Sequence, residues 1–294
     1  MTEFVEPSGL KAFVGQYQAD IEAALLRFLP APVAGAERLQ EAMRYSLLAG
    51  GKRVRPLLVL ASSHAVSEVN DACWPAVAAI EYIHTYSLIH DDLPSMDDDE
   101  LRRGKPTCHI AFDEATAILA GDALQCAAFE CLAEQRSTLP MVSFLSKAAG
   151  AAGMVAGQAI DMAAVDKAVD LNYLTHMHRN KTGALIRASV QMGALAGGAS
   201  PSQLSDLEQY AEAIGLAFQI QDDILDVTSE TQVLGKQQGA DAAANKPTYV
   251  SLLGLDGAKR KAQETLDTAL TALADLPNPQ VLAELARYIV QRDH

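Results

Sequence analysis

The chain has 294 residues, of which 49% are hydrophobic and only 5% aromatic, and its formal net charge is −14. The acidic balance argues against a nucleic-acid-binding protein, which needs clustered lysines and arginines to neutralise phosphates. The shortage of aromatic residues argues against a β-sandwich and favours an aliphatic, helical core.

Helical periodicity runs along almost the whole chain. Apolar residues recur at three- and four-residue intervals in 9–29, 36–49, 55–67, 72–92, 108–136, 138–164, 170–196, 204–225, 242–252, 257–275 and 278–292. Glycine and proline clusters separate these ranges. Because no linker divides the chain, the sequence predicts an all-α protein with a single domain over 1–294.

Membrane and export signals are not evident in the sequence. The most apolar stretch, 76–89, carries Glu81 and His84 and is too short for a transmembrane helix. The N-terminal residues lack the basic-then-apolar profile of a signal peptide. A cytoplasmic protein without an integral membrane segment is therefore expected.

The first distinctive segment is glycine-rich and basic. Gly50-Gly51-Lys52-Arg53-Val54-Arg55-Pro56 concentrates three cations between two predicted helices. It is either a solvated turn before a helix or a pocket for a diphosphate. For the second function, arginine offers a two-pronged donor, lysine a point charge, and glycine a close approach of the backbone.

An acidic cluster follows the apolar run 83–89. Six acidic groups within 91–100 repel one another unless they are solvated or neutralised. Pro94 cannot donate a backbone hydrogen bond, so the helix is expected to bend there and to bring Asp97 back beside Asp91. His84 lies seven residues before Asp91 and therefore on nearly the same helical face.

A second acidic cluster occupies 222–226. Asp222 and Asp226 are four residues apart and face the same way along a helix. No lysine or arginine lies within a turn of them, so a bound cation is expected as their counter-charge. Oxygen-only ligands select Mg²⁺ or Mn²⁺ over Zn²⁺. Each cluster alone could be a solvated helix end, but the pair favours a metal site.

Together these segments resemble the trans-isoprenyl diphosphate synthases, in their bacterial form. The resemblance covers almost the whole chain. It rests on GGKRVRP at 50–56, IHTYSLIHDDLPSMDDDELRRGKPTCH at 83–109, AGDAL at 120–124, KTGAL at 181–185, FQIQDDILD at 218–226 and NKPTY at 245–249. It implies helices packed around a deep apolar cavity, a homodimer, and condensation of isopentenyl diphosphate with dimethylallyl or geranyl diphosphate.

The resemblance also implies a role for each matching residue. Mg²⁺, or Mn²⁺ in its place, would be held by Asp91, Asp92, Asp97, Asp222 and Asp226. The allylic diphosphate would contact Arg102, Lys181, Thr182, Gln219, Lys236 and Lys246. The diphosphate of isopentenyl diphosphate would contact Lys52, Arg55, His84 and Arg103. The catalytic roles would fall to Asp91, Asp97, Arg102, Lys181 and Asp222.

Product length is expected to depend on Tyr86 and Ser87, one turn before Asp91. An aromatic residue at 86 implies a fifteen-carbon, farnesyl product in this family, although Tyr86 could merely pack between helices. Three alternatives stay open: a geranylgeranyl diphosphate synthase, a non-catalytic partner or cation-binding protein, and a class I terpene cyclase. A cyclase binds only one diphosphate. The basic segment 50–56, as a site for a second diphosphate, therefore disfavours a cyclase.

Overall fold

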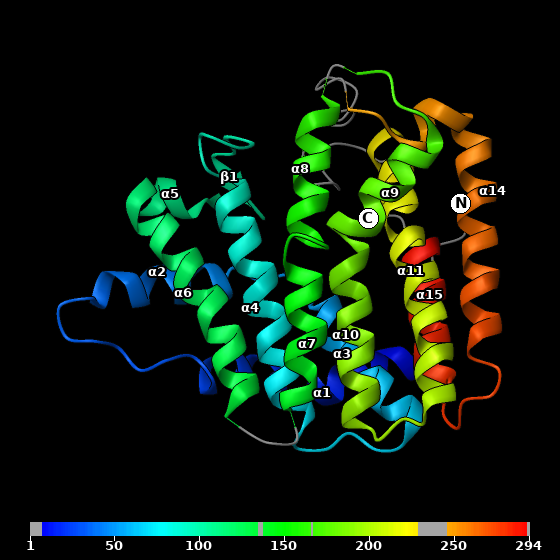
Figure 1. Cartoon of the computed structure of the whole chain (residues 1–294), viewed down its shortest axis with the longest axis horizontal. Coiled ribbons are helices and arrows are strands. Elements are labelled where there is room, and N and C mark those ends of the chain that lie inside the picture. Colours follow the sequence, from blue (N-terminus) through cyan, green and yellow to red (C-terminus); the bar gives the residue numbers. More distant parts are fainter. Residues whose placement is uncertain (1–7, 135–137, 166, 229–245, 293–294) are drawn as a thin grey trace.

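The computed structural model describes residues 8–134, 138–165, 167–228 and 246–292 (Figure 1). The prediction of an all-α fold is confirmed, because strands in the described residues are limited to one short antiparallel pair. The elements, labelled as in Figure 1, are α1 (Ser8–Arg27), α2 (Glu37–Leu47), α3 (Val54–Val66), α4 (Cys73–Asp91), β1 (Leu101–Arg102), β2 (Lys105–Pro106), α5 (Cys108–Ala111), α6 (Glu114–Ala133), α7 (Leu139–Ala149), α8 (Met154–Ala164), α9 (Leu171–Lys181), α10 (Gly183–Ala196), α11 (Pro201–Thr228), α14 (Tyr249–Ala272) and α15 (Gln280–Gln291).

Several predicted helices have different limits in the structure. The range 108–136 divides at Asp113, whose carboxylate caps α6 by accepting the Thr116 N–H at 2.7 Å. The ranges 138–164 and 170–196 each divide into two helices as well. Helix α14 is kinked at Gly254, whose φ of +70 is not helical and is a conformation that glycine adopts at little cost, so the chain bends between the predicted ranges 242–252 and 257–275.

Helix α4 lies at the centre of the bundle and carries the first acidic cluster at its end. It packs against α1, α3, α6 and α10, while α10 packs in turn against α3 and α11, and α11 against α14 (Figure 1). The residues 76–80 of α4 are fully buried, so the helix is apolar on every face. Because α4 is buried, the first acidic cluster at its end has a fixed position.

Two segments are long and apolar enough to cross a membrane, Glu114–Ala133 and Leu139–Ala164. The sequence alone did not single them out. The second is divided into α7 and α8, and both segments pack against neighbouring helices of the bundle. Core helices of soluble proteins share this composition, so the expected lack of a membrane segment stays a prediction.

Candidate functional site

The first acidic cluster folds back on itself where α4 ends. The Asp97 N–H donates to the Asp91 carbonyl oxygen at 2.9 Å, and the Asp98 N–H donates to the Leu93 carbonyl at 3.2 Å. Asp98 adopts a left-handed conformation, with φ +52. Helix α4 ends at Asp91, before Pro94, rather than bending at Pro94, and the turn that follows places Asp97 beside Asp91 as predicted.

A cavity of about 420 Å³ opens beneath this turn. Its lining includes the apolar residues Leu88, Met96, Met154, Val155, Met162 and Leu185. Charged and polar groups line it as well, at Arg55, His84, Asp91, Lys181 and Thr182. Tyr86 and Ser87 also line it, so both predicted chain-length residues face the cavity. An apolar pocket with a few convergent polar groups is the usual form of a small-molecule site.

Asp91 and Lys181 are two oppositely charged groups in the lining of the cavity. Burial raises the pKa of Asp91 to about 6; Lys181 opposes this rise and Asp97 adds to it. The Lys181 ammonium donates to the Asp161 carboxylate at 2.5 Å. Next to it, the Thr182 hydroxyl donates to the Gln219 side-chain oxygen. Three of the predicted allylic-diphosphate residues therefore lie together.

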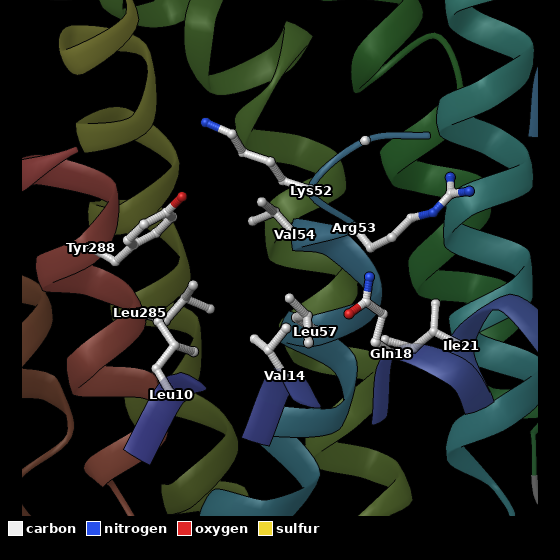
Figure 2. Close-up of a pocket in the computed structure, with 11 residues that line it drawn as sticks. Leu10, Val14, Gln18, Ile21, Lys52, Arg53, Val54, Leu57, Leu285 and Tyr288 are labelled. Carbon is white, nitrogen blue, oxygen red and sulfur yellow. The ribbon is translucent and has the colours of Figure 1, made fainter. Parts of the chain in front are cut away.

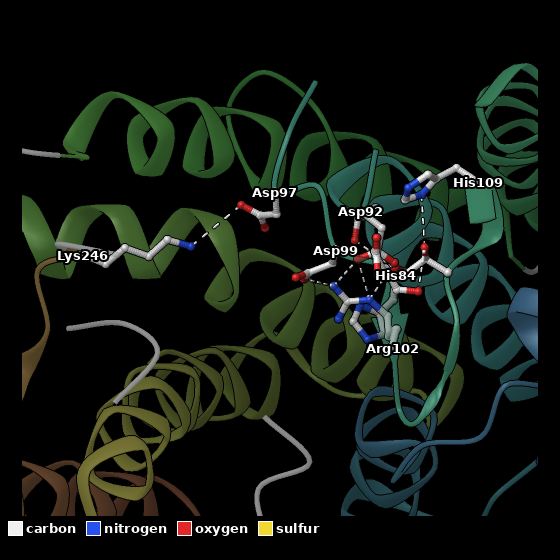
Figure 3. A network of polar contacts seen from close by, with 10 residues as sticks. His84, Asp92, Asp97, Asp99, Arg102, His109 and Lys246 are labelled. Atoms are coloured by element: carbon white, nitrogen blue, oxygen red, sulfur yellow. Dashed lines mark hydrogen bonds and ion pairs between the residues drawn. The ribbon is translucent and has the colours of Figure 1, made fainter. Parts of the chain in front are cut away.

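Asp92 lines a different cavity from Asp91 and is paired with Arg102. Its side chain is only 3% exposed, and Arg102 donates to it through Nε at 2.8 and 2.9 Å and through Nη2 at 2.5 Å (Figure 3). Burial raises the pKa of Asp92, and Arg102 opposes the rise. Both residues line a separate small cavity. The predicted roles of Asp92 in metal binding and of Arg102 in diphosphate binding thus require this pair to rearrange.

The second acidic cluster lies on α11, with its three aspartates in different surroundings. Asp223 is buried and accepts the Tyr249 N–H at 2.6 Å, which ties α11 to α14. Asp226 is half-buried. Asp222 forms an ion pair with Arg292. No lysine or arginine lies within a turn of the cluster, as the sequence showed, but Arg292, 70 residues later in the chain, provides Asp222 with a cation.

Of the four residues proposed to bind the diphosphate of isopentenyl diphosphate, Arg55 and His84 line this cavity, whereas Lys52 and Arg103 do not. Burial lowers the pKa of His84 well below 6.5, and Arg55 and Arg103 lower it further, so the imidazole is neutral. Arg55 lines the cavity, and its Nε is buried without a hydrogen-bond partner. An arginine with an unused donor beside other cations favours an anionic ligand.

Arg103 reaches the glycine loop from the opposite direction. Its guanidinium donates to the Gly50 carbonyl oxygen. A Cβ on Gly51 would lie 2.6 Å from the same guanidinium, and Gly51 has φ +119. Glycine is therefore favoured at 51 by conformation, and a Cβ there would displace the Arg103 guanidinium.

The remaining predicted residues occupy different places. Lys52 borders a second cavity, of about 200 Å³, between α1, α3 and α15 (Figure 2). The Lys246 ammonium lies 3.9 Å from the Asp97 carboxylate (Figure 3). Lys236 lies outside the described residues.

The donor atoms of the site suit a hard divalent cation. In the described part of the chain, no three acidic, histidine or cysteine side chains already converge on one point. Mg²⁺ commonly takes one or two carboxylates and completes its shell with water and phosphate oxygens. Asp91 and Asp97, joined by the turn, fit that pattern.

Asp161 and the apolar face of α8 were not identified from the sequence. Asp161 is the one charged residue of α8 and is 9% exposed, in contact with Lys181. A lone carboxylate in an apolar helix is a signal that could have been noticed. The cavity-lining role of Met154, Val155 and Met162 could not, because it depends on how α8 packs against α9 and its other neighbours.

Comparison with known proteins agrees with this geometry. The sequence model of the family described as "Polyprenyl synthetase" matches residues 36–289. The chain belongs to the polyprenyl synthetase family. The resemblance noted from the motifs is thereby confirmed.

Individual members of the family are similar over most of their length. The farnesyl diphosphate synthase of Escherichia coli (strain K12) is 49% identical over 300 residues, covering 98% of this chain and 99% of that protein. The chloroplastic geranylgeranyl pyrophosphate synthase of Catharanthus roseus is 46% identical, over 87% of this chain and 74% of that protein. The crystal structure of a Helicobacter pylori geranyltransferase, complexed with magnesium and isoprenyl diphosphate, has a TM-score of 0.83 and 34% identity, covering 98% of both chains.

Proposed function

We propose that this member of the family condenses isopentenyl diphosphate with dimethylallyl diphosphate and then with geranyl diphosphate. The product is farnesyl diphosphate, and pyrophosphate is released in each round. The observation that carries the proposal is the cavity lined both by charged groups, among them Asp91 and Lys181, and by apolar side chains. The similarity to a farnesyl diphosphate synthase at 49% identity supports the same activity.

The polar residues that line the cavity would have complementary roles in this reaction. Lys181 and Thr182 lie where the allylic diphosphate would enter, and donors held there stabilise the charge that develops as its C1–O bond breaks. Arg55, with neutral His84 beside it, would hold the diphosphate of isopentenyl diphosphate, so that its double bond lies next to the allylic carbon. The apolar wall excludes water from the cation. Loss of a proton then gives the new double bond, with pyrophosphate as the proposed base.

The proposed metal is Mg²⁺, with Mn²⁺ as an alternative. Asp91, Asp97, Asp222 and Asp226 would hold it, with Asp92 joining after release from Arg102. Once bound, a divalent cation neutralises the leaving diphosphate as a Lewis acid. The magnesium and isoprenyl diphosphate in the H. pylori structure support this proposal.

The main alternative function, a geranylgeranyl diphosphate synthase, differs from the proposed one in the length of its product. The similarity to the C. roseus enzyme keeps a geranylgeranyl product in consideration. Tyr86 favours the shorter product, because its ring borders the cavity and is only 5% exposed. A terpene cyclase has no use for the second group of cations around Arg55.

The state of the protein in the cell is also part of the proposal. We propose a cytoplasmic, single-domain homodimer. Helices α6 and α7 expose large apolar side chains that a second copy could cover: Ile118, Leu119 and Leu139. Analytical ultracentrifugation tests the dimer, and a monomer at micromolar concentration would contradict it.

The activity is tested by incubating the purified protein with isopentenyl and dimethylallyl diphosphates, with and without Mg²⁺. Products are dephosphorylated and separated by chromatography. Farnesol only when Mg²⁺ is present supports the proposal. A twenty-carbon alcohol favours the alternative, a cyclised hydrocarbon indicates a cyclase, and no condensation rules out a prenyltransferase.

A further inference from the structure

Arg53 and its neighbour Lys52 leave the glycine-rich loop in different directions (Figure 2). Lys52 borders the cavity beside α1, whereas the guanidinium of Arg53 is turned into the protein, with the side chain only 7% exposed. The basic segment is therefore not a uniform set of ligand-binding cations. One of its three cations is used inside the fold.

The buried guanidinium is held by three elements. It donates to Glu81 of α4 at 2.7 Å, to Glu22 of α1 at 2.7 Å, and to the Leu47 carbonyl at the end of α2 at 2.6 Å. Glu81 is itself only 3% exposed in its side chain. Burial works against the charge of Arg53, yet the contacts with Glu22 and Glu81 raise its pKa.

The backbone of Arg53 is strained at the same place. Its φ of +48 and ψ of +37 are left-handed, a conformation that costs free energy for a residue with a side chain. Arg53 precedes α3 directly, so this conformation sets the direction from which Arg55 enters the cavity. The buried ion pair offsets the strain and keeps the loop in this form.

Glu81 also acts on the two neighbouring arginines that carry the proposed diphosphate contacts. Burial lowers the pKa of both Arg55 and Arg103, and Glu81 is the first group that opposes this in each case. The Gly50 carbonyl, in the same loop, accepts the hydrogen bond from Arg103. Glu81 thus lies at the centre of a group of cations that would otherwise repel one another.

We infer that Glu81, through its ion pair with Arg53, is a positioning residue for the pocket that binds isopentenyl diphosphate. It fixes the loop 50–55 and supplies the counter-charge that keeps Arg55 and Arg103 together when the pocket is empty. The inference rests on the proposed function for the identity of the ligand. It assigns Glu81 no contact with that ligand.

The test is Glu81→Gln, which keeps the shape and removes the charge. We expect the KM for isopentenyl diphosphate to rise about tenfold or more, while the KM for geranyl diphosphate changes by less than about twofold. Arg53→Lys, which keeps the charge but loses the forked geometry, should shift the same KM in the same direction. This second variant keeps the inference testable if the Glu81→Gln protein fails to fold.

Tyr210→Phe is the matched control for stability. It removes a buried hydrogen bond to the Leu282 carbonyl, 2.9 Å long, at the contact of α11 with α15. It should lower the Tm without changing the KM for isopentenyl diphosphate relative to the KM for geranyl diphosphate. If Glu81→Gln lowers the Tm and leaves both KM values as they are, or raises both equally, the positioning role is wrong.

Calorimetric titration with isopentenyl diphosphate alone separates this inference from the proposed activity. One substrate cannot condense, so the titration reads binding only. Weaker binding by Glu81→Gln supports the inference even if the native protein forms no product. Unchanged binding refutes it even if farnesol is formed.

Discussion

Arg292, just after the last helix, forms an ion pair with Asp222 and lies 4.3 Å above the ring of Phe218. The Gln221 side chain also donates to the Arg292 carbonyl at 2.9 Å. The end of the chain is thereby fastened to the second acidic cluster. Because the proposed metal would need the same carboxylate, Arg292 and the metal compete for Asp222.

This competition predicts that Arg292→Gln binds Mg²⁺ more tightly when substrate is absent. A partly exposed ion pair contributes about 1 kcal/mol, so the apparent Kd should fall about fivefold. Mn²⁺ titration followed by electron paramagnetic resonance measures it. Arg287→Gln, on the exposed face of α15, is the control and should leave the Kd unchanged. An equal or higher Kd for Arg292→Gln contradicts competition.

The two adjacent acidic residues Asp97 and Asp98 should differ sharply in importance. Asp97→Asn removes a carboxylate held beside Asp91, and we expect kcat to fall by about a hundredfold or more. Asp98→Asn should retain most activity, because asparagine tolerates the left-handed conformation at φ +52. Pyrophosphate release at saturating substrate measures both. Equal losses would mean that the turn, rather than one carboxylate, matters.

Changing the residues that border the cavity should change product length. Tyr86→Ala enlarges the space below Asp91 and should give products longer than fifteen carbons. Ser87→Phe should stop elongation at ten carbons. Chromatography of the prenyl alcohols compares the products of both variants with those of a control, Tyr82→Phe. Tyr82 lies on the same helix, and its hydroxyl donates to the Leu25 carbonyl. An unchanged fifteen-carbon product in Tyr86→Ala would exclude Tyr86 from the cavity floor.

The glycine loop offers a matched pair of substitutions. Gly51→Ala should raise the KM for isopentenyl diphosphate about tenfold, because the new Cβ displaces the Arg103 guanidinium. At Gly50, φ is +93 but a Cβ would meet no atom within 4 Å, so Gly50→Ala adds backbone strain alone. Steady-state kinetics and the Tm of both proteins separate the two effects. The same KM in both variants would argue against a role for Arg103.

Stability should depend on pH through His178. This side chain is 8% exposed, both ring nitrogens lack partners, and burial lowers its pKa to about 4. The unfolded chain takes up the proton near pH 6.5, so between pH 6.5 and 4 it binds more protons than the folded protein, and stability falls as the pH falls. The full effect is roughly 3 kcal/mol.

Replacing His178 should therefore flatten this dependence. His178→Phe keeps the stacking on Tyr249, 5.8 Å between ring centroids, and should gain stability over the native protein as the pH falls from about 7 to about 5. Urea unfolding at a series of pH values measures the difference. His176→Gln, at an exposed position of α9, should show no such gain. A constant difference between His178→Phe and native protein would disprove the titration of His178 as the cause.

Local patterns in the sequence determined the all-α class, the family and the positions of both acidic clusters. The periodicity of the apolar residues indicates helices along the chain, and Pro94, three residues beyond the end of α4, cannot donate the backbone hydrogen bond of a continuing helix. The turn that joins Asp97 to Asp91 follows from those few residues. These features depend on interactions within one or two helical turns, so they can be predicted without knowing how the helices pack against one another.

Only the tertiary structure decided which charges neutralise one another. Arg53 pairs with Glu81, Arg102 with Asp92, and Arg292 with Asp222. The sequence had instead suggested a diphosphate as the partner of Arg102 and a metal ion as the partner of Asp92 and Asp222. The reason is physical: an ion pair depends on distance and burial, and packing brings together residues that lie far apart along the chain. Lys181 shows the same principle, since its partner Asp161 lies on another helix.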